Sequence, residues 1–390
     1  MVMRNNGGLL GIDFGTSNSC AALLYPDGKL EIVRIDEYDE MFPSCVYLNR
    51  AGEIEVGITA EQQALDEPCR FRDKLKKDLL ENKPIFLGGQ KFAPYQLISP
   101  VLAYIKQVAE RLYAPLERVV ITVPAGYTKR EKELMEKAAR EAGFGELTTL
   151  AEPLAAAIYY ARQENNPLPP GSCALIYDFG GGTFDAALVE MTENGYIFPG
   201  IQGCLRDCGG TDMDIMLARK ILSQCGPEFE SRLVSGSTDA EIRLQYELLD
   251  LCRKRIKHRL TELQEVTARL PYGLPLGQFQ MTRKEFNAMI TPMIRRTIQC
   301  CEQTIANAKK KPSDLALILL VGGSSNIPLV KEELQRSFAC PVMLAKKPQL
   351  AVCQGAALSF DKGRENVTLP SLTPSGNDLW IDYNPSQGIF

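Results

Sequence analysis

Two short motifs place an aspartate where an apolar strand is expected to meet a glycine turn. They are IDFGTSN at residues 12–18 and YDFGGGTFD at residues 177–185. In each motif a carboxylate, Asp13 or Asp178, stands beside glycines and hydroxyl side chains, so that negative charge and free backbone N–H groups converge. This combination suits a magnesium-bound polyphosphate.

A single aspartate of this kind usually bonds only the backbone of its own turn. Two of them in duplicated settings, about one domain length apart, favour a shared function over two ordinary turns. The duplication predicts two related lobes that face each other across a cleft.

The segments around the first motif predict alternating strands and helices, and therefore an α/β fold. Residues 9–48 alternate apolar and turn residues, as in a meander of antiparallel strands. Apolar periodicity predicts helices at residues 96–112, 128–144 and 154–163, and a buried strand at residues 118–124. These elements would form one lobe with crossover helices.

The second half repeats this plan after a loop rich in Pro and Asn at residues 164–172. Its strand and phosphate turn lead into a hairpin partner, a long helical region, a strand at residues 315–321 and the turn GGSSNIP. Such a repeat indicates an internal duplication. We therefore predict lobe I at residues 1–170, lobe II at residues 171–362 with a helical subdomain at about 212–310, and a tail at residues 363–390.

Composition and charge disfavour several functional classes. A chain of 390 residues exceeds what one core usually organises. Lys plus Arg number 44 against 48 for Asp plus Glu, and the net charge of −4 gives no reason to expect nucleic acid or an anionic membrane as a partner. No apolar run approaches the ~18 residues that span a bilayer. The first residues show no signal-peptide pattern, so the expected location is cytoplasmic.

Cysteine and histidine chemistry is also disfavoured. The 12 cysteines are scattered and form no CxxC pair, so we expect most of them to be small buried hydrophobes rather than zinc or redox ligands. The one histidine, His258, has no nucleophile elbow near it. This disfavours Ser-His-Asp and Cys-His hydrolases.

A series of motifs in this order resembles the ATPase domain of the seventy-kilodalton heat-shock (DnaK-type) chaperones. The motifs are IDFGTSN, ITVPAGYTKREKELMEKAAREAG, LAEPLAAAIYYA, YDFGGGTFD, MTRKEF and LVGGSSNIPLV, and the resemblance covers nearly the whole chain. The wider superfamily, with actin and the sugar kinases, shares the two phosphate turns and the adenosine turn. The resemblance implies the two-lobed actin-like ATPase fold, with duplicated ribonuclease H-like domains and a central cleft for ATP or ADP with Mg²⁺.

The same resemblance implies roles for residues at the phosphate end of the cleft. Asp13 and Asp178 would hold Mg²⁺, mainly through water, with Asp185 as a further acid. Glu152 and Thr183 would act beside the metal, the attacking water and the γ-phosphate, so that the catalytic set is Lys74, Glu152, Asp178 and Thr183. The phosphate-binding residues would be Gly15, Thr16, Ser17, Asn18, Gly180, Gly181 and Gly182.

Lys74 is predicted as the catalytic lysine because it follows Phe71 by three residues, the spacing in the family. It would neutralise charge on the γ-phosphate. Because Lys76 and Lys77 follow closely, a solvated charged helix face is the alternative. Pro124 and Lys132 would relay the nucleotide state, although a proline that closes a strand is also ordinary, and Lys132 replaces the arginine of the family.

The adenosine end departs from the family pattern. The implied residues are Gly210, Lys257, His258, Thr261, Gly322, Gly323, Ser324 and Asn326. Asn326 and His258 stand where the family has two arginines that enclose adenine, and Lys254 stands where it has a glutamate. Losing stacked cations could cost on the order of 1–2 kcal/mol of ring binding. Weak ATP affinity is therefore expected.

Near the end of the chain, NDLWIDYNP at residues 377–385 resembles the linker that leads into the peptide-binding domain of the chaperones. The alternatives are a natural pair of ATPase lobes without a client domain, a chain cut after its linker, or a loose tail.

The sequence thus predicts an ATPase that hydrolyses Mg·ATP slowly with water as the nucleophile and uses lobe closure as a switch. Its partners would be nucleotide and a co-chaperone, an exchange factor or client proteins, with no nucleic acid and no membrane. Two alternatives stay open: a small-molecule kinase of the same superfamily, and a pseudo-ATPase scaffold that binds nucleotide weakly.

Overall fold

Two main sheets organise the chain. This computed structural model describes residues 8–359, apart from residues 35–38, 65, 113–114, 164–167, 194 and 237. The first sheet has the strand order β11 (Leu147–Ala151), β10 (Leu116–Val123), β1 (Gly8–Asp13), β2 (Asn18–Leu24) and β3 (Leu30–Ile32), with β4 (Phe42–Pro43) paired to β2. The second has the order β14 (Gly195–Ile197), β13 (Phe184–Thr192), β12 (Cys173–Phe179), β18 (Leu315–Val321) and β19 (Val342–Leu344), with β15 (Gly203–Leu205) paired to β13.

The two sheets repeat one plan. In the first, β1 pairs antiparallel with β2 and parallel with β10. In the second, β12 pairs antiparallel with β13 and parallel with β18. The central strands β1 and β12 are mainly apolar because both faces of each sheet are covered. The repeat confirms the prediction of an α/β fold with two lobes of similar topology.

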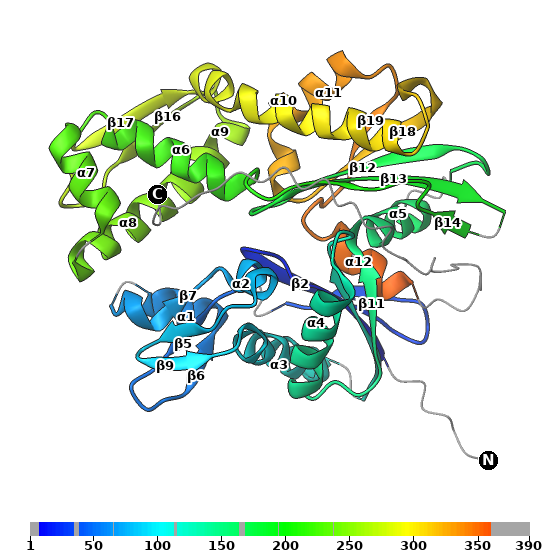
Figure 1. Cartoon of the computed structure of the whole chain (residues 1–390), viewed down its shortest axis with the longest axis horizontal. Helices are drawn as coiled ribbons and strands as arrows, with labels where there is room; N and C mark the ends of the chain where they lie inside the picture. The colour runs from blue at the N-terminus through cyan, green and yellow to red at the C-terminus, as the bar shows by residue number, and fades with distance from the viewer. Residues whose placement is uncertain are drawn as a thin grey trace.

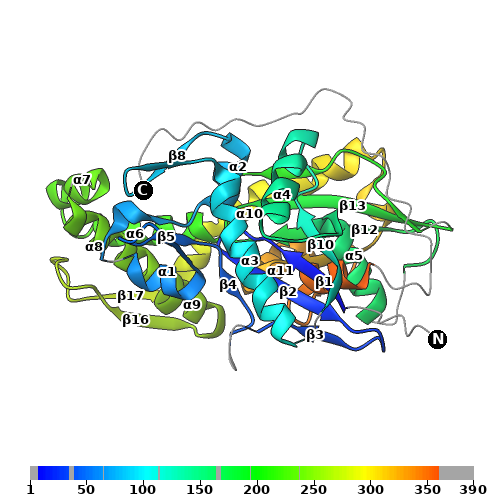
Figure 2. The ribbon, with the colours of Figure 1, turned by 90° about the horizontal axis from the view of Figure 1, so that it is seen from below.

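Helices cover the outer faces of the sheets (Figures 1 and 2). Helices α3 (Pro94–Leu112) and α4 (Lys129–Glu141) share a buried apolar core with the first sheet. Helices α10 (Arg283–Asn307) and α11 (Pro328–Ser337) share another with the second. Burying one apolar face of each helix against a sheet supplies the main stabilising term of both lobes.

Two further helices, α5 (Glu152–Gln163) and α12 (Ala351–Leu358), lie between the sheets (Figure 1). One apolar cluster joins them to both sheets, for example Val120 of β10 and Ile176 of β12. Helix α12 also packs on β1 and β2. It therefore packs against the lobe I sheet, although its residues fall in the range predicted for lobe II. The predicted tail lies outside the described residues.

Each lobe carries a smaller unit, and the two units face each other (Figure 1). That of the first lobe consists of α1 (Gly57–Gln63), α2 (Leu75–Glu81), β5 (Val46–Leu48), β6 (Ile54–Val56), β7 (Phe71–Arg72), β8 (Ile85–Leu87) and β9 (Gln90–Phe92). That of the second consists of α6 (Gly210–Leu222), α7 (Pro227–Ser235), α8 (Asp239–Leu251), α9 (His258–Glu262), β16 (Glu265–Arg269) and β17 (Gln278–Thr282).

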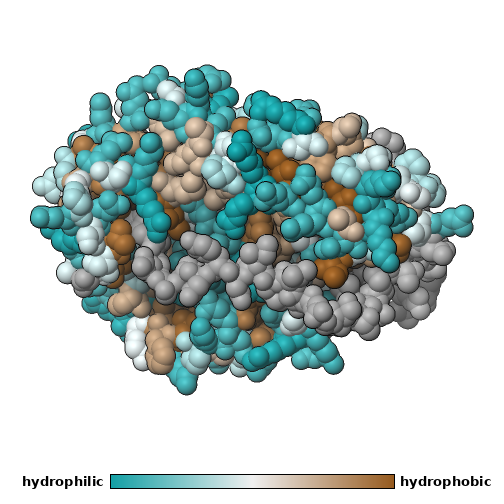
Figure 3. Space-filling view, turned by 45° about the horizontal axis from the view of Figure 1, so that its top comes forward, coloured by the Kyte–Doolittle hydropathy of each residue, from teal (hydrophilic) through white to brown (hydrophobic). Residues whose placement is uncertain are grey.

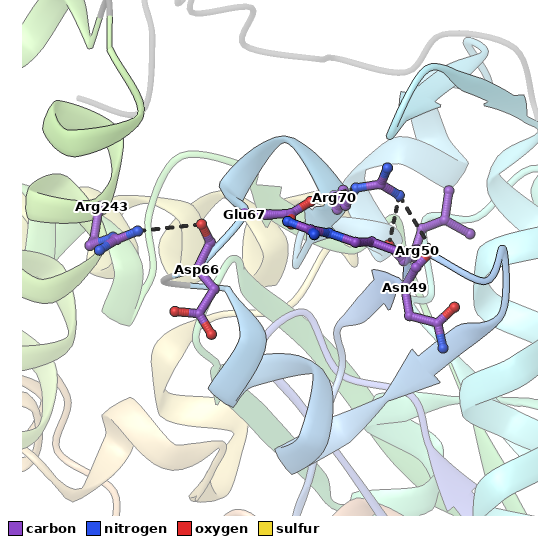
Figure 4. Close-up of polar contacts among 7 residues, drawn as sticks. Asn49, Arg50, Asp66, Glu67, Arg70 and Arg243 are labelled. Carbon is purple, nitrogen blue, oxygen red and sulfur yellow. Dashed lines mark hydrogen bonds and ion pairs between the residues drawn. The ribbon is translucent and has the colours of Figure 1, made fainter.

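The two smaller units touch across the cleft. Arg243 of α8 donates to the backbone oxygen of Asp66 at 3.3 Å, and Arg50, Glu67 and Arg70 form ion pairs beside it (Figure 4). The rings of Phe71 and Tyr246 meet edge to face, with centroids 5.7 Å apart. The lobes are therefore joined at their tips as well as through α5 and α12.

The motif MTRKEF has a local structural role, because it forms the start of α10. The Thr282 hydroxyl accepts from the Glu285 N–H at 3.3 Å, and the Glu285 carboxylate accepts from the Thr282 N–H at 2.9 Å. This reciprocal cap satisfies two helix-end donors. No helix in the described ranges is both long and apolar enough to cross a bilayer.

Candidate functional site

The two predicted phosphate turns lie face to face. A Cβ atom on Gly182 would fall 2.4 Å from Cγ2 of Thr16, and one on Gly181 would fall 2.6 Å from Oγ of Ser17. A Cβ on Gly182 would also fall 2.8 Å from Cβ of Thr16, which cannot rotate away, so at this position the second turn can approach the first only as glycine. Because the turns belong to opposite lobes, a phosphate group at this point would touch both.

These turns line a cavity of about 610 Å³. Its walls include most residues that the sequence predicted for the phosphate, metal and adenosine positions. They are Asp13, Gly15, Thr16, Ser17, Asn18, Glu152, Asp178, Gly180, Gly181, Gly182, Thr183, Asp185, Gly210, Lys257, His258, Thr261, Gly322, Gly323, Ser324 and Asn326. Lys74, Pro124 and Lys132 do not line it.

Four carboxylates gather at the phosphate end of the cavity. Asp178 and Asp185 stand directly opposite each other on β12 and β13, and the charges of Asp13 and Glu152 also act on Asp178. Burial, reinforced by Glu152, raises the pKa of Asp13 to about 7 and that of Asp185 to about 6, and the pKa of Asp178 is also raised. Like charges placed this way destabilise the fold unless a cation lies among them.

The donor set fits Mg²⁺. No three His, Cys, Asp or Glu side chains within the described residues converge closely enough to hold a metal by themselves. Mg²⁺ prefers one or two carboxylates, several waters and phosphate oxygens, and it rarely occupies a site made only of protein atoms. Carboxylates beside hydroxyl-bearing turns therefore suit an ion that arrives with a polyphosphate.

Lys76 is the cation at these carboxylates. Its Nζ lies 2.8 Å from Oε1 of Glu152, and both side chains are buried. Burial opposes the charge of Lys76, but Glu152, Tyr127 and Asp13 outweigh it and raise the lysine pKa. Lys76 is therefore a fixed positive charge beside the phosphate turns.

The structure brings Lys76 to this position and leaves Lys74 outside the cavity. Lys74 precedes the first turn of α2 and lines a neighbouring pocket. On a helix, Lys76 shares a face with Leu79 and Leu80, three and four residues on, and Leu79 is fully buried. Helical periodicity could therefore have distinguished the lysines, whereas the spacing from Phe71 could not.

The end of the cavity that the sequence predicts to bind adenosine is built by a π-helical turn, Cys252–Lys257, between α8 and α9. Its wider backbone, a common feature of functional sites, carries Lys257 into the cavity. Lys257 Nζ lies 2.8 Å from Oδ1 of Asp214 and donates to the Gly210 oxygen at 2.7 Å. The sequence did not indicate Asp214 or Arg253, which also line the cavity. The sequence feature that could have indicated them is Asp214 itself, because a charged residue on the buried face of a predicted helix needs a partner.

The other residues predicted to bind adenosine connect this end of the cavity to the phosphate end through hydrogen bonds. The Ser324 hydroxyl donates to the Gly180 oxygen at 2.7 Å. Asn326 Nδ2 donates to the Gly323 oxygen at 2.9 Å, so that one amide hydrogen is already used. Partial burial, with the charges of Lys257 and nearby cations, lowers the pKa of His258 to about 4. The imidazole is therefore neutral at pH 7.

A second pocket of about 660 Å³ adjoins the first. Both share Thr16, Ser17, Lys76, Thr183 and Asp185 as part of their walls, and the second continues between the two smaller units. Pro124 lines this second pocket. Lys132 lies on α4, outside both pockets.

Comparison with known proteins agrees with these motifs. The family model described as Hsp70 protein matches residues 9–79 and 72–368. The chaperone protein DnaK of Thermosipho melanesiensis is 28% identical over 396 residues, and that of Thermotoga maritima is 28% identical over 398 residues. Each comparison covers 98% of this chain and 64% of the relative. The chaperone protein HscA homolog of Aeromonas hydrophila is 30% identical over 375 residues, which cover 90% of this chain and 57% of that protein.

The chain spans less than two thirds of the length of these relatives. The matched region nevertheless contains both sheets, both phosphate turns and the adenosine turn. The paired sheets are those of the actin-like ATPase fold that the motifs predicted. By the extent of the family match, this chain belongs to the Hsp70 protein family.

Proposed function

We propose that this chain binds Mg·ATP between its lobes and hydrolyses it slowly, with water as the nucleophile. The observation that carries the proposal is the meeting of Gly181 and Gly182 with Ser17 and Thr16 from the opposite lobe, beside four carboxylates and Lys76. Such a site provides backbone donors for phosphate oxygens and charges for a metal.

In this proposal Asp13 and Asp178 hold Mg²⁺ through water, and the ion neutralises charge on the phosphates when bound. Lys76 takes the role that the sequence assigned to Lys74 and stabilises charge on the γ-phosphate oxygens. Glu152 holds Lys76 in place through their 2.8 Å ion pair. Thr183, whose hydroxyl is 3.0 Å from Asp185, orients the water.

The residues at the phosphate end support ATP hydrolysis. The residues at the adenosine end give less support for tight binding of the nucleotide. Ring binding would rest on a neutral imidazole, His258, and an amide, Asn326, that already bonds Gly323. Both groups stack less strongly than a guanidinium. We therefore propose weak nucleotide affinity and reduced preference for adenine over guanine.

The test is phosphate release in a single turnover, with protein in excess over radiolabelled ATP and Mg²⁺ present. Lys76→Ala should slow release by about 100-fold, as loss of a charge-stabilising donor does in other sites. Lys74→Ala, the matched control two residues away, should stay within about two-fold of wild type. Equal rates in wild type and Lys76→Ala, or a loss confined to Lys74→Ala, would contradict the assignment.

The adjoining pocket favours a second candidate, a small-molecule kinase. Asp185 lines both pockets, so a carboxylate that could act as a base faces a space large enough for an acceptor. ATP consumption that rises on addition of glycerol, glucose or acetate would support this candidate. Consumption independent of all three would favour water as the acceptor.

Lobe closure around the nucleotide is the proposed output of the site. Co-chaperones, exchange factors and clients are proposed partners only by analogy with the longer relatives. The cytoplasmic location likewise remains a prediction.

A further inference from the structure

Three strands of the second sheet place one row of side chains beside the cleft. Asp178 of β12 is opposite Asp185 of β13, and Asp185 is opposite Cys204 of β15. Directly opposed residues of antiparallel strands point to the same face, with Cβ atoms about 4.5–5.5 Å apart. The face is that of the cleft, because Asp178 lines the nucleotide cavity and Cys204 the adjoining pocket, while Asp185 lines both.

Two donor groups lie beside Asp185, one immediately before its own strand and one on β15. The Thr183 hydroxyl donates to its Oδ2 at 3.0 Å. The Cys204 side chain, its cross-strand neighbour, lies on the same face and lines the same pocket as this carboxylate. An ordinary thiol keeps its proton at pH 7, so the S–H group of Cys204 is available as a donor to this carboxylate.

The backbone around Cys204 is fixed. A Cβ atom on the preceding Gly203 would fall 2.4 Å from the Cys300 sulfur and 2.6 Å from the Thr304 hydroxyl, so β15 lies tightly against α10. This contact holds the backbone that carries Cys204 against α10. Cys204 is partly exposed, unlike most of the cysteines, which are buried as the sequence predicted.

We infer that Cys204 is a positioning residue for the reaction, whose S–H group holds Asp185 in the orientation that keeps the Thr183 hydroxyl aimed at the water and the γ-phosphate. The inference rests on the proposed ATPase function. The alternative is that Cys204 is a small buried hydrophobe like most of the other cysteines. That role explains neither its position opposite Asp185 nor its exposure to the pocket.

The experiment compares three variants in single-turnover phosphate release and in Mg·ATP binding. Cys204→Ala removes the donor, Cys204→Ser restores an O–H donor, and Cys208→Ala removes a nearby buried thiol whose sulfur lies 4.0 Å from the Met293 oxygen instead. We expect Cys204→Ala to slow release about ten-fold, as loss of a hydrogen bond to a charged group does, with the Kd for Mg·ATP unchanged. Cys204→Ser should recover most of the rate, and Cys208→Ala should match wild type.

Two outcomes would overturn the inference while the proposed function stands: a wild-type rate in Cys204→Ala, or equal losses in Cys204→Ala and Cys204→Ser. A wild-type protein that releases no phosphate would overturn the proposed function and this role together. The contact has a readout of its own. The infrared S–H band of Cys204 is the one that disappears in Cys204→Ala. This band should shift to higher frequency in Asp185→Asn, because the hydrogen bond is weakened. An unshifted band would show that the thiol does not bond Asp185.

Discussion

At the scale of single residues, the site gathers charges that do not favour folding. Four buried or partly buried carboxylates, Asp13, Glu152, Asp178 and Asp185, share the influence of Lys76. The motifs indicated the aspartates because glycine turns and carboxylates have a local signature. Lys76 has no motif of this kind, and only its helical spacing from the buried Leu79 sets it apart from Lys74.

Asp13→Asn should stabilise the nucleotide-free protein at high pH. The folded-state pKa of Asp13, about 7, lies above its unfolded value near 4, so the wild type loses stability as the pH rises from about 4 to 7. The Asn variant lacks this loss and should exceed wild type by up to about 4 kcal/mol above pH 7. Denaturant unfolding across this range measures it. A difference that does not vary with pH would contradict the argument.

At the scale of elements, strand and helix assignments followed from sequence pattern, whereas the turn that carries Lys257 did not. The π-helical stretch Cys252–Lys257 interrupts what reads as one continuous helix from α8 to α9. Its wider turn changes the direction of the Lys257 side chain relative to α8. Lys257 thereby reaches Asp214 of α6. Apolar periodicity does not distinguish such a local change, because both helix types bury similar faces. Helix α12 was also unpredictable in its packing, since its apolar residues suit either sheet.

Two ion pairs around this π-helical turn should differ strongly in their effect on stability. Lys257 and Asp214 are buried, whereas Lys254 and Asp250 form an exposed pair at 2.9 Å. Asp214→Asn leaves a buried lysine without its counter-charge and should lower the free energy of unfolding by about 3–5 kcal/mol. Asp250→Asn, the matched control, should change it by less than about 1 kcal/mol. Similar changes in the free energy of unfolding for both variants, measured by denaturant unfolding, would argue against a buried Lys257–Asp214 pair.

At the scale of the whole molecule, two repeated sheets are held together at two places. The inner contact is the cluster of α5 and α12, and the outer contact joins the smaller units through Arg243 and Asp66 and through Phe71 and Tyr246. Repetition of an apolar strand and a glycine turn was enough to predict the paired lobes. The outer contact was not predictable, because residues such as Phe71 and Tyr246 are distant in sequence. Figure 3 shows hydrophilic side chains over much of one face, with smaller apolar patches among them.

Weakening the outer contact should accelerate nucleotide release. Tyr246→Ala removes the ring that meets Phe71 across the cleft, an interaction worth about 0.5–1.5 kcal/mol. The off-rate of a fluorescent ADP, followed by stopped flow, should rise by about two- to ten-fold. Tyr272→Ala, which alters a fully exposed tyrosine of the same smaller unit, should leave the rate unchanged. Identical off-rates for the two variants would show that the tip contact does not restrain the cleft.

In the proposed site, aspartates from opposite lobes hold one magnesium–triphosphate group between them. Calorimetric titration of Mg·ATP into wild type, Asp13→Asn, Asp178→Asn and the double variant tests it most directly. We expect one site per chain and a loss of at least about ten-fold in affinity for each single variant. The double variant should bind little more weakly than either single one, because both residues act on the same ion. Equal affinity in all four proteins, or no binding by wild type at high protein concentration, would contradict it.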